Sequence, residues 1–248
     1  MSTTLDCQLL PWDTEFFGFR IGRVVGSLEG TANIASACEW AATHRLRCVY
    51  LLVGSGDCET IQSAEDHGFR FVDVRMTLGR KTVESHHATP STADAASIVR
   101  LFVPADLPAL EPVAAAVHRD SRFFVDRGFG EESAAALFAR WFRQSCEGDA
   151  QAVWVAALGG RAVGYLTCHL DPPDRGRIGL VGVAPEARGM GVGRALLDRS
   201  LSWFRGNNAA SVTVVTQGRN VAALRAYERA GFTTRSVEFW YHKWFKAS

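Results

Sequence analysis

The sequence lacks an excess of charge of either sign and a long apolar run. Its 27 lysines and arginines nearly balance 26 aspartates and glutamates, for a formal net charge of +1. This balance gives no basic field of the kind that binds nucleic acid or an anionic membrane. No apolar run approaches the ~20 residues of a transmembrane helix, and the start, MSTTLDCQLLPWD, has no basic region followed by an apolar core. We therefore expect a cytoplasmic protein with no nucleic-acid and no membrane partner.

Metal-binding patterns are also missing. The six cysteines stand at wide, irregular spacings without a CxxC pair, and the histidines are scattered apart from His86 and His87. These spacings match no zinc or redox motif, and we interpret the cysteines as small buried hydrophobic residues. We expect no metal site. The length of 248 residues is sufficient for two small domains.

The stretch from Arg177 to Arg205 predicts a strand, a glycine-rich turn and a helix. The apolar run 178–183 is typical of a buried strand and ends before Pro185. Three glycines then fall within residues 188–193, directly before a segment whose apolar residues recur at helical spacing.

Glycines at the start of a helix predict an anion site. Without a Cβ the backbone adopts positive φ and exposes its amides, and the first four N–H groups of a helix lack partners within it. Each hydrogen bond to a charged group contributes about 1.5–3 kcal/mol, against roughly 0.3–2 kcal/mol in total from the helix dipole. Several such amides would hold a pyrophosphate.

Two common phosphate-binding motifs fit this turn poorly. A P-loop needs Gly-Lys-Ser/Thr, and here Gly193 is followed by Arg194. A dinucleotide-binding turn lies early in a βαβ unit with an acidic residue about 20 residues later, but this turn lies late in the chain and residues 217–219 are Gln-Gly-Arg. The turn instead resembles the coenzyme A pyrophosphate loop of the GNAT superfamily of N-acetyltransferases, in Val183-Ala184-Pro185 followed by Arg188-x-x-Gly191-x-Gly193.

A second motif, from Asn220 to Phe232, predicts a helix that ends at Gly231. It resembles the other half of the GNAT acyl-CoA site, where the asparagine faces the pantetheine arm and the tyrosine, here Tyr227, lies near the thioester sulfur. From the residues alone, Asn220 is also a helix N-cap, and Tyr227 could be a half-buried core aromatic.

The resemblance implies that acetyl-CoA is the co-substrate and that Tyr227 is the catalytic general acid, which protonates the departing thiolate. It also implies that a main-chain N–H of residues 181–183 serves the thioester oxygen. The co-substrate-binding residues that it implies are Val181, Gly182, Val183, Arg188, Gly189, Met190, Gly191, Val192, Gly193, Arg194, Asn220 and Tyr227.

The chain contains an internal repeat. Residues 48–69 lie without gaps over residues 211–232, at a constant offset of 163 (211 − 48). Strand, glycine-bearing turn, helix and Gly-Phe ending coincide, with Ala64 opposite Tyr227. The first half has no counterpart of the glycine loop, so we expect no acyl-CoA site there.

The expected fold class is α/β, a GNAT fold with a mixed, mostly antiparallel central sheet flanked by helices. We expect a truncated GNAT-like domain in residues 1–81, a polar linker in 82–95 and the catalytic GNAT domain in 96–248. A last pair of strands is expected between Thr233 and Phe245. These strands could pack internally or across a dimer, so both monomer and homodimer stay open.

Two further motifs concern the acceptor. The opening WDTEFFGF and the segment Asp120-Ser121-Arg122-Phe123 resemble the nucleotide-sugar branch of the superfamily. That resemblance implies transfer to the 4-amino group of dTDP-4-amino-4,6-dideoxygalactose or a similar small-molecule nucleotide sugar, and Arg122 suits a diphosphate. The acceptor-binding residues that we expect are His118, Asp120, Ser121, Arg122 and Phe123. From the residues alone, the segment could also be a helix cap with a surface ion pair.

The general base stays open, because residues 177–183 contain no carboxylate. His118, Asp120, His169 and a chain of water molecules are the candidates. Other acceptors also fit the sequence, namely an aminoglycoside, an amino acid or a protein N-terminus. A non-catalytic acyl-CoA sensor is a further possibility, against which the intact Tyr227 argues.

Overall fold

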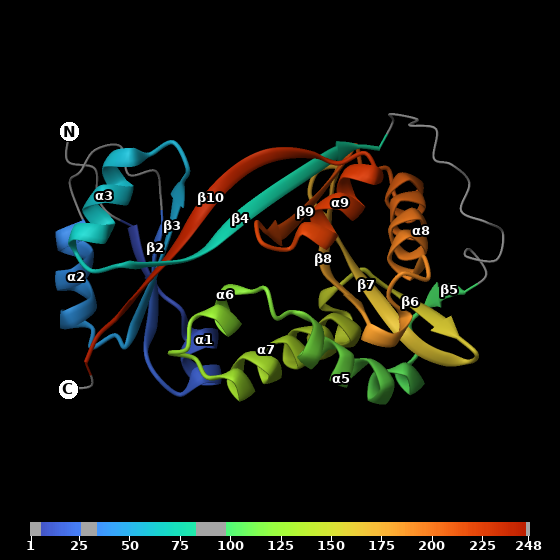
Figure 1. Cartoon of the computed structure of the whole chain (residues 1–248), viewed down its shortest axis with the longest axis horizontal. Helices are drawn as coiled ribbons and strands as arrows, with labels where there is room; N and C mark the ends of the chain where they lie inside the picture. Colours follow the sequence, from blue (N-terminus) through green and yellow to red (C-terminus); the bar gives the residue numbers. More distant parts are fainter. Residues whose placement is uncertain (1–5, 26–33, 83–97, 247–248) are drawn as a thin grey trace. The chain divides into compact units, whose positions relative to one another are not determined.

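The computed structural model of the chain describes residues 6–25, 34–82 and 98–246. The elements up to β5 are β1 (Asp6–Leu9), α1 (Pro11–Phe17), β2 (Ile21–Val25), α2 (Ile34–Thr43), β3 (Cys48–Gly54), α3 (Cys58–Asp66), β4 (Arg70–Lys81) and β5 (Val99–Leu101). The following elements are α5 (Leu107–Val117), α6 (Arg122–Val125), α7 (Glu131–Gln144), β6 (Ala152–Leu158), β7 (Arg161–Asp171), β8 (Arg175–Val183), α8 (Val192–Gly206), β9 (Ser211–Gln217), α9 (Val221–Arg229) and β10 (Thr233–Trp244). Figure 1 labels these elements along the ribbon, except β1.

The chain divides into two compact units that are not continuous in sequence. Unit 1 comprises Met1–Arg75, Ser121–Ser133 and Ser236–Ser248, and unit 2 comprises Met76–Asp120 and Ala134–Arg235. Unit 1 contains the neighbouring strands β1, β2, β3 and part of β10, while unit 2 contains β9, β8, β7, β6 and β5 in spatial order. The predicted linker 82–95 lies outside the described residues except for Thr82, and the sequence-based domain boundaries stay a prediction.

The expected mixed sheet is confirmed. Strands β2 and β3 are parallel, as are β8 and β9, whereas β1 with β2, β3 with β10 and the run from β5 to β8 pair antiparallel. No helix within the described ranges is long and apolar enough to span a membrane.

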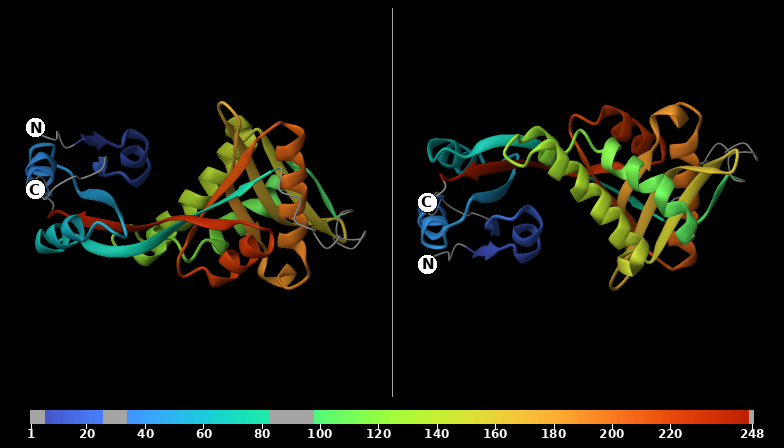
Figure 2. Two further views of the ribbon diagram at one scale, coloured as in Figure 1. Left: turned by 90° about the horizontal axis from the view of Figure 1, so that it is seen from above. Right: turned by 90° about the horizontal axis from the view of Figure 1, so that it is seen from below.

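Helices cover both faces of the sheet in unit 2, because the strand residues alternate between two cores. Trp154 and Leu166 pack with apolar residues of α8 on one face. Val155 and Tyr165 pack on the other face with residues of α5 and with Phe142 of α7. Figure 2 shows the orange α8 and the green α5 and α7 on opposite sides of the strands. Each large apolar side chain buried in this way contributes about 1.5–3 kcal/mol.

The two copies of the repeat have the same local structure. The bounds of β3, α3 and β4 each shift by 163 onto those of β9, α9 and β10. The helix caps correspond, since Asp57 accepts from the amide of Thr60 and Asn220 from that of Ala223, both at 3.1 Å. Both helices also end at a positive-φ glycine. That the first copy is a truncated member of the same family stays a prediction.

The predicted strand pair between Thr233 and Phe245 is wrong, because the structure has the single strand β10 (Thr233–Trp244) there. The physical reason is visible in the sequence, TTRSVEFWYHKW, which contains no Gly, Pro, Asn or Asp to form a turn.

Candidate active site

Strands β8 and β9 diverge in the middle of unit 2. They pair in parallel from Arg175 opposite Ser211 to Ile178 opposite Val214, and the pairing then stops although both strands continue. The register between β7 and β8 also shifts next to Thr167, whose hydroxyl accepts a hydrogen bond from the amide of Leu180 at 2.8 Å. Such a bulge bends a strand and leaves backbone groups outside the ladder.

A cavity of about 420 Å³ occupies this divergence. Its walls come from β8, the glycine loop, the start of α8, the end of β9 and one side of α9. His118 and Phe138 complete the lining. The lining residues are His118, Phe138, Gly179, Leu180, Val181, Val183, Ala187, Arg188, Gly189, Val192, Gly193, Leu197, Val215, Thr216, Gln217, Asn220, Ala222, Ala223, Ala226 and Tyr227.

The cavity reaches both faces of the sheet. Val181 and Val183 pack with the core on the α8 face, whereas Leu180 packs with the core on the α5 face. Because all three line one cavity, the opening between β8 and β9 passes through the plane of the sheet. A long ligand can enter on one face while a second molecule meets its end on the other.

The glycine loop has the conformation that an anion site needs. Gly189 and Gly191 both have φ of 78°, and Gly191 is the N-cap of α8. A residue with a Cβ rarely adopts this backbone. The first turn of α8 contains no acidic side chain, and the cap has no side-chain hydrogen bond, so its amides are available to a ligand.

Asn220 and Tyr227 both line the cavity. The N-cap role of Asn220 is confirmed by its 3.1 Å hydrogen bond from the amide of Ala223. Tyr227 is 6% exposed and belongs to the core that includes α8. Burial raises the pKa of its hydroxyl, which keeps Tyr227 protonated at neutral pH and able to donate a proton.

His118 follows α5 and stacks on Phe138, with ring centroids 4.4 Å apart. Its Nε2 lies 2.8 Å from the hydroxyl of Tyr165. Burial alone lowers the pKa of His118 to about 4, so the imidazole is neutral at neutral pH.

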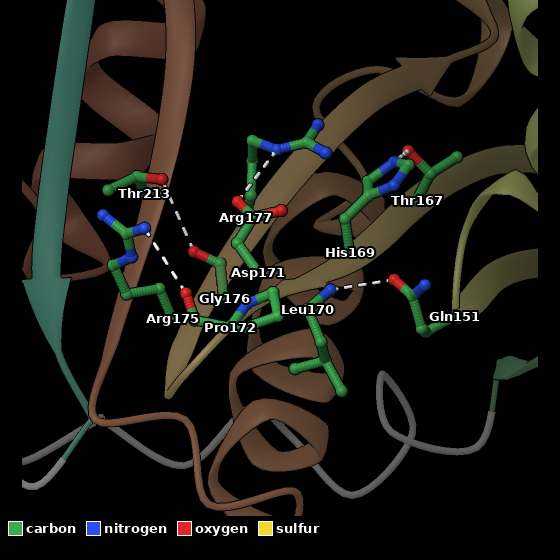
Figure 3. Close-up of polar contacts among 10 residues, drawn as sticks. All are labelled: Gln151, Thr167, His169, Leu170, Asp171, Pro172, Arg175, Gly176, Arg177 and Thr213. Carbon is green, nitrogen blue, oxygen red and sulfur yellow. Dashed lines mark hydrogen bonds and ion pairs between the residues drawn. The ribbon is translucent and has the colours of Figure 1, made fainter.

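His169, another candidate base, does not belong to the cavity lining. It is 8% exposed, and its Nε2 lies 3.5 Å from the hydroxyl of Thr167, as Figure 3 shows. Burial and the nearby charge of Arg177 lower its pKa. In the same view Arg177 pairs with Asp171 at 3.3 Å.

The expected acceptor residues are divided between the units. His118 lines the cavity, and Asp120 is at the end of a segment of unit 2, while Ser121, Arg122 and Phe123 belong to unit 1. There the Arg122 guanidinium lies 4.1–4.3 Å from the centroids of three aromatic rings, and its Nη1 is 2.7 Å from Nε2 of His242. The cap alternative holds for Ser121, which is the N-cap of α6, whereas Arg122 packs against these rings and His242 and is not part of a surface ion pair.

Of the expected co-substrate residues, the cavity lining includes Val181, Val183, Arg188, Gly189, Val192, Gly193, Asn220 and Tyr227 and does not include Gly182, Met190, Gly191 or Arg194. The Cα of Gly182 instead faces the ring of Tyr165. Met190 is 61% exposed, and the guanidinium of Arg194 pairs with Asp198 one turn along α8.

No group of three or more His, Cys, Asp or Glu side chains that could hold a metal ion occurs in the parts of the chain that the structure describes. The sequence analysis did not identify Phe138, Tyr165 or the bulge at Thr167. No local pattern in the run 161–170 marks Tyr165, because its place opposite Gly182 depends on the register between β7 and β8.

Comparison with known proteins agrees with this geometry. Residues 115–232 match the model of the Acetyltransferase (GNAT) family. The chain is 24% identical over 247 residues to the dTDP-fucosamine acetyltransferase of Escherichia coli O6:H1, covering 98% of this chain and 100% of that protein. It is 32% identical over 141 residues to the spore coat polysaccharide biosynthesis protein SpsD of Bacillus subtilis, covering 57% of this chain and 48% of that protein.

A solved structure shares the fold. The GCN5-related N-acetyltransferase from Sphaerobacter thermophilus superposes with a TM-score of 0.68 at 18% identity, covering 96% of this chain and 76% of that one. The part of the chain that matches the Acetyltransferase (GNAT) family, residues 115–232, contains the divergent strands and the glycine loop.

Proposed function

We propose that the protein transfers an acetyl group from acetyl-CoA to the 4-amino group of a nucleotide-linked amino-deoxysugar, such as dTDP-4-amino-4,6-dideoxygalactose. The observation that carries this proposal is the similarity to a dTDP-fucosamine acetyltransferase, which extends over 98% of this chain and the whole of that protein. It therefore includes unit 1 as well as the cavity-bearing unit. The similarity to a polysaccharide biosynthesis protein supports the same class of acceptor.

In this proposal acetyl-CoA would enter the cavity with its pyrophosphate at the glycine loop and its thioester near Tyr227. Its pyrophosphate would bind the amides of the loop from Arg188 to Arg194, where two positive-φ glycines shape the backbone. The pantetheine arm would lie between the diverging strands β8 and β9, beside Asn220. The thioester oxygen would accept a hydrogen bond from a main-chain N–H of residues 181–183.

The chemistry needs a neutral amine close to the thioester carbon and a proton for the departing thiolate. Positioning is the larger contribution, at roughly 7–11 kcal/mol, whereas one general acid accelerates a reaction about 100- to 10,000-fold. Tyr227 is the proposed acid because it lines the cavity and keeps its proton at neutral pH.

We propose His118 and the segment Asp120-Ser121-Arg122-Phe123 as the acceptor-binding residues. The contact of His118 with the cavity supports this assignment for that residue. For the rest of the segment the support is its resemblance to the nucleotide-sugar branch. The acceptor is a small molecule in this proposal.

Mass spectrometry after incubation with acetyl-CoA tests the substrate class. The panel contains dTDP- and UDP-4-amino-4,6-dideoxyhexoses, an aminoglycoside and a peptide with a free N-terminus, and a mixture without acetyl-CoA is the control. A gain of one acetyl group on a nucleotide sugar supports the proposal. Acetylation of the aminoglycoside or the peptide alone would contradict the nucleotide-sugar assignment. It would not contradict acetyl transfer as the activity.

A further inference from the structure

Tyr165 of β7 has no role in the site described above, although its position is tightly constrained. Its side chain is fully buried, and it stands directly opposite Gly182 of β8. A Cβ on Gly182 would lie 2.5 Å from Cε1 of the Tyr165 ring and 2.8 Å from its hydroxyl oxygen. The ring can therefore occupy this place under β8 only because residue 182 is a glycine.

This placement brings the Tyr165 hydroxyl to His118. The oxygen lies 2.8 Å from Nε2 of the imidazole, and the imidazole ring is nearly parallel to that of Phe138, at 17°. One nitrogen is thus held by Tyr165 and one ring face by Phe138. In the described part of the chain, the other nitrogen, Nδ1, has no hydrogen-bond partner.

His118 lies where an acceptor amine would arrive. The co-substrate side of the cavity is formed by α8 and by Tyr227, which share one core. His118 comes from the opposite face, because it follows α5 and bonds Tyr165, a member of the core on that face. The cavity joins the two faces, so a thioester entering on the α8 face would meet an amine beside His118.

We infer that His118, held in place by Tyr165, accepts the proton that the acceptor amine loses during acetyl transfer. The inference rests on transfer to an amine, as the proposed function has it, and not on which amine that is. His118 is the catalytic base in this scheme, and Tyr165 is a positioning residue.

The step balances as follows. The amine lone pair forms the C–N bond to the thioester carbon, and the C–S bond breaks with its electron pair going to sulfur. The amine nitrogen gives one proton to the lone pair on Nδ1 of His118. The Tyr227 hydroxyl gives its proton to the sulfur of coenzyme A. The products are the amide and the coenzyme A thiol, and proton transfer through solvent from imidazolium to tyrosinate restores both groups.

Protonation states are consistent with this assignment. Burial is the cause of the lowered pKa of His118, and no charged group shifts it further. Burial also raises the pKa of Tyr165, with a smaller effect from Cys146, so Tyr165 keeps its proton. The neutral imidazole is the form that can accept a proton, and the amine becomes a stronger acid as the C–N bond forms.

The other candidate bases are placed less well. Neither His169 nor Asp120 lines the cavity. His169 is also directed at the Cα of Gly179 from within β7, where a Cβ on that glycine would lie 2.6 Å from its Nε2.

The test compares His118→Gln and Tyr165→Phe with the wild type, using whichever amine of the panel the wild type acetylates. We expect His118→Gln to lower kcat about 100- to 10,000-fold and Tyr165→Phe to lower it about 2- to 10-fold, both with unchanged affinity for acetyl-CoA. In His118→Gln, log kcat should rise with pH, because solvent then has to accept the proton that the acceptor amine loses. The control is His44→Gln, since His44 bonds the carbonyl of Trp40 within unit 1.

Added imidazoles separate a base from a structural role. They should restore turnover in His118→Ala with a rate that rises with the pKa of the imidazole. A His118→Gln variant with kcat within twofold of the wild type, or with a flat pH profile, would overturn the inference.

If the wild type acetylates no amine of the panel, the nucleotide-sugar proposal fails. The inference about His118 is then tested by NMR of the ¹⁵N-labelled imidazole, which reports the protonation state of the ring. A ring that is neutral at pH 7 and changes its signals in Tyr165→Phe supports it. A His118 that is protonated at pH 7 overturns it.

Discussion

Gly191→Ala should weaken acetyl-CoA binding, although the added methyl group would not clash with any neighbouring atom. Gly191 has φ of 78° as the N-cap of α8, and a Cβ there would meet no atom within 4 Å. The substitution therefore acts through the backbone alone. An L-residue in this conformation costs about 1–2 kcal/mol, and the loop can relieve the cost by turning its amides away from the pyrophosphate.

The size of the effect follows from the hydrogen bonds at stake. Each bond to a charged group contributes about 1.5–3 kcal/mol, so the loss of one raises the Kd about 10- to 150-fold at 1.4 kcal/mol per tenfold. Isothermal titration calorimetry with acetyl-CoA measures it. S-acetylpantetheine lacks the pyrophosphate, and its binding should not change.

Gly206→Ala is the matched control. Gly206 ends the same helix with open space around its Cα and no positive φ, so alanine there should leave acetyl-CoA binding unaltered. Equal acetyl-CoA affinity in Gly191→Ala and the wild type would refute the placement of the pyrophosphate. Equal weakening of S-acetylpantetheine would show that the substitution damages the whole cavity instead.

Three further predictions concern single side chains. Tyr227→Phe should lower kcat about 100-fold or more with little change in the Kd of acetyl-CoA, and an unchanged kcat would remove Tyr227 from the mechanism. Gly182→Ala places a Cβ 2.5 Å from the Tyr165 ring and should destabilise the protein by about 1–3 kcal/mol in urea unfolding; an unaltered midpoint would contradict the close contact. Asp126→Ala removes the acceptor of a 2.6 Å hydrogen bond from Nδ1 of buried His242 and should cost about 1–3 kcal/mol, so a loss below about 0.5 kcal/mol would contradict that contact.

Local features could be predicted from the sequence. The glycine loop and the N-cap Asn220 are specified by residues that lie next to one another in the chain, and the structure has them where the pattern placed them. The repeat was recognisable for the same reason, since a βαβ segment carries its caps and its closing glycine with it. The position of Tyr227 on the cavity wall also followed from its motif.

Features that depend on distant pairing could not be predicted. The contact of His118 with Tyr165 joins residues 47 positions apart, and it requires both the register of β7 on β8 and the glycine opposite Tyr165. The surroundings of Arg122 depend on Tyr50 and Trp240, which are remote in sequence. The motif around Arg122 indicated a polar role, but the three rings that enclose it come from separate elements.

The most direct test of the central claim is the product formed from acetyl-CoA and dTDP-4-amino-4,6-dideoxygalactose. We predict one equivalent of coenzyme A thiol for each acetyl group gained, with NMR of the product showing an amide at the 4-nitrogen. Recovery of the nucleotide sugar unchanged, under conditions in which the same preparation acetylates another amine, would contradict the account of the acceptor.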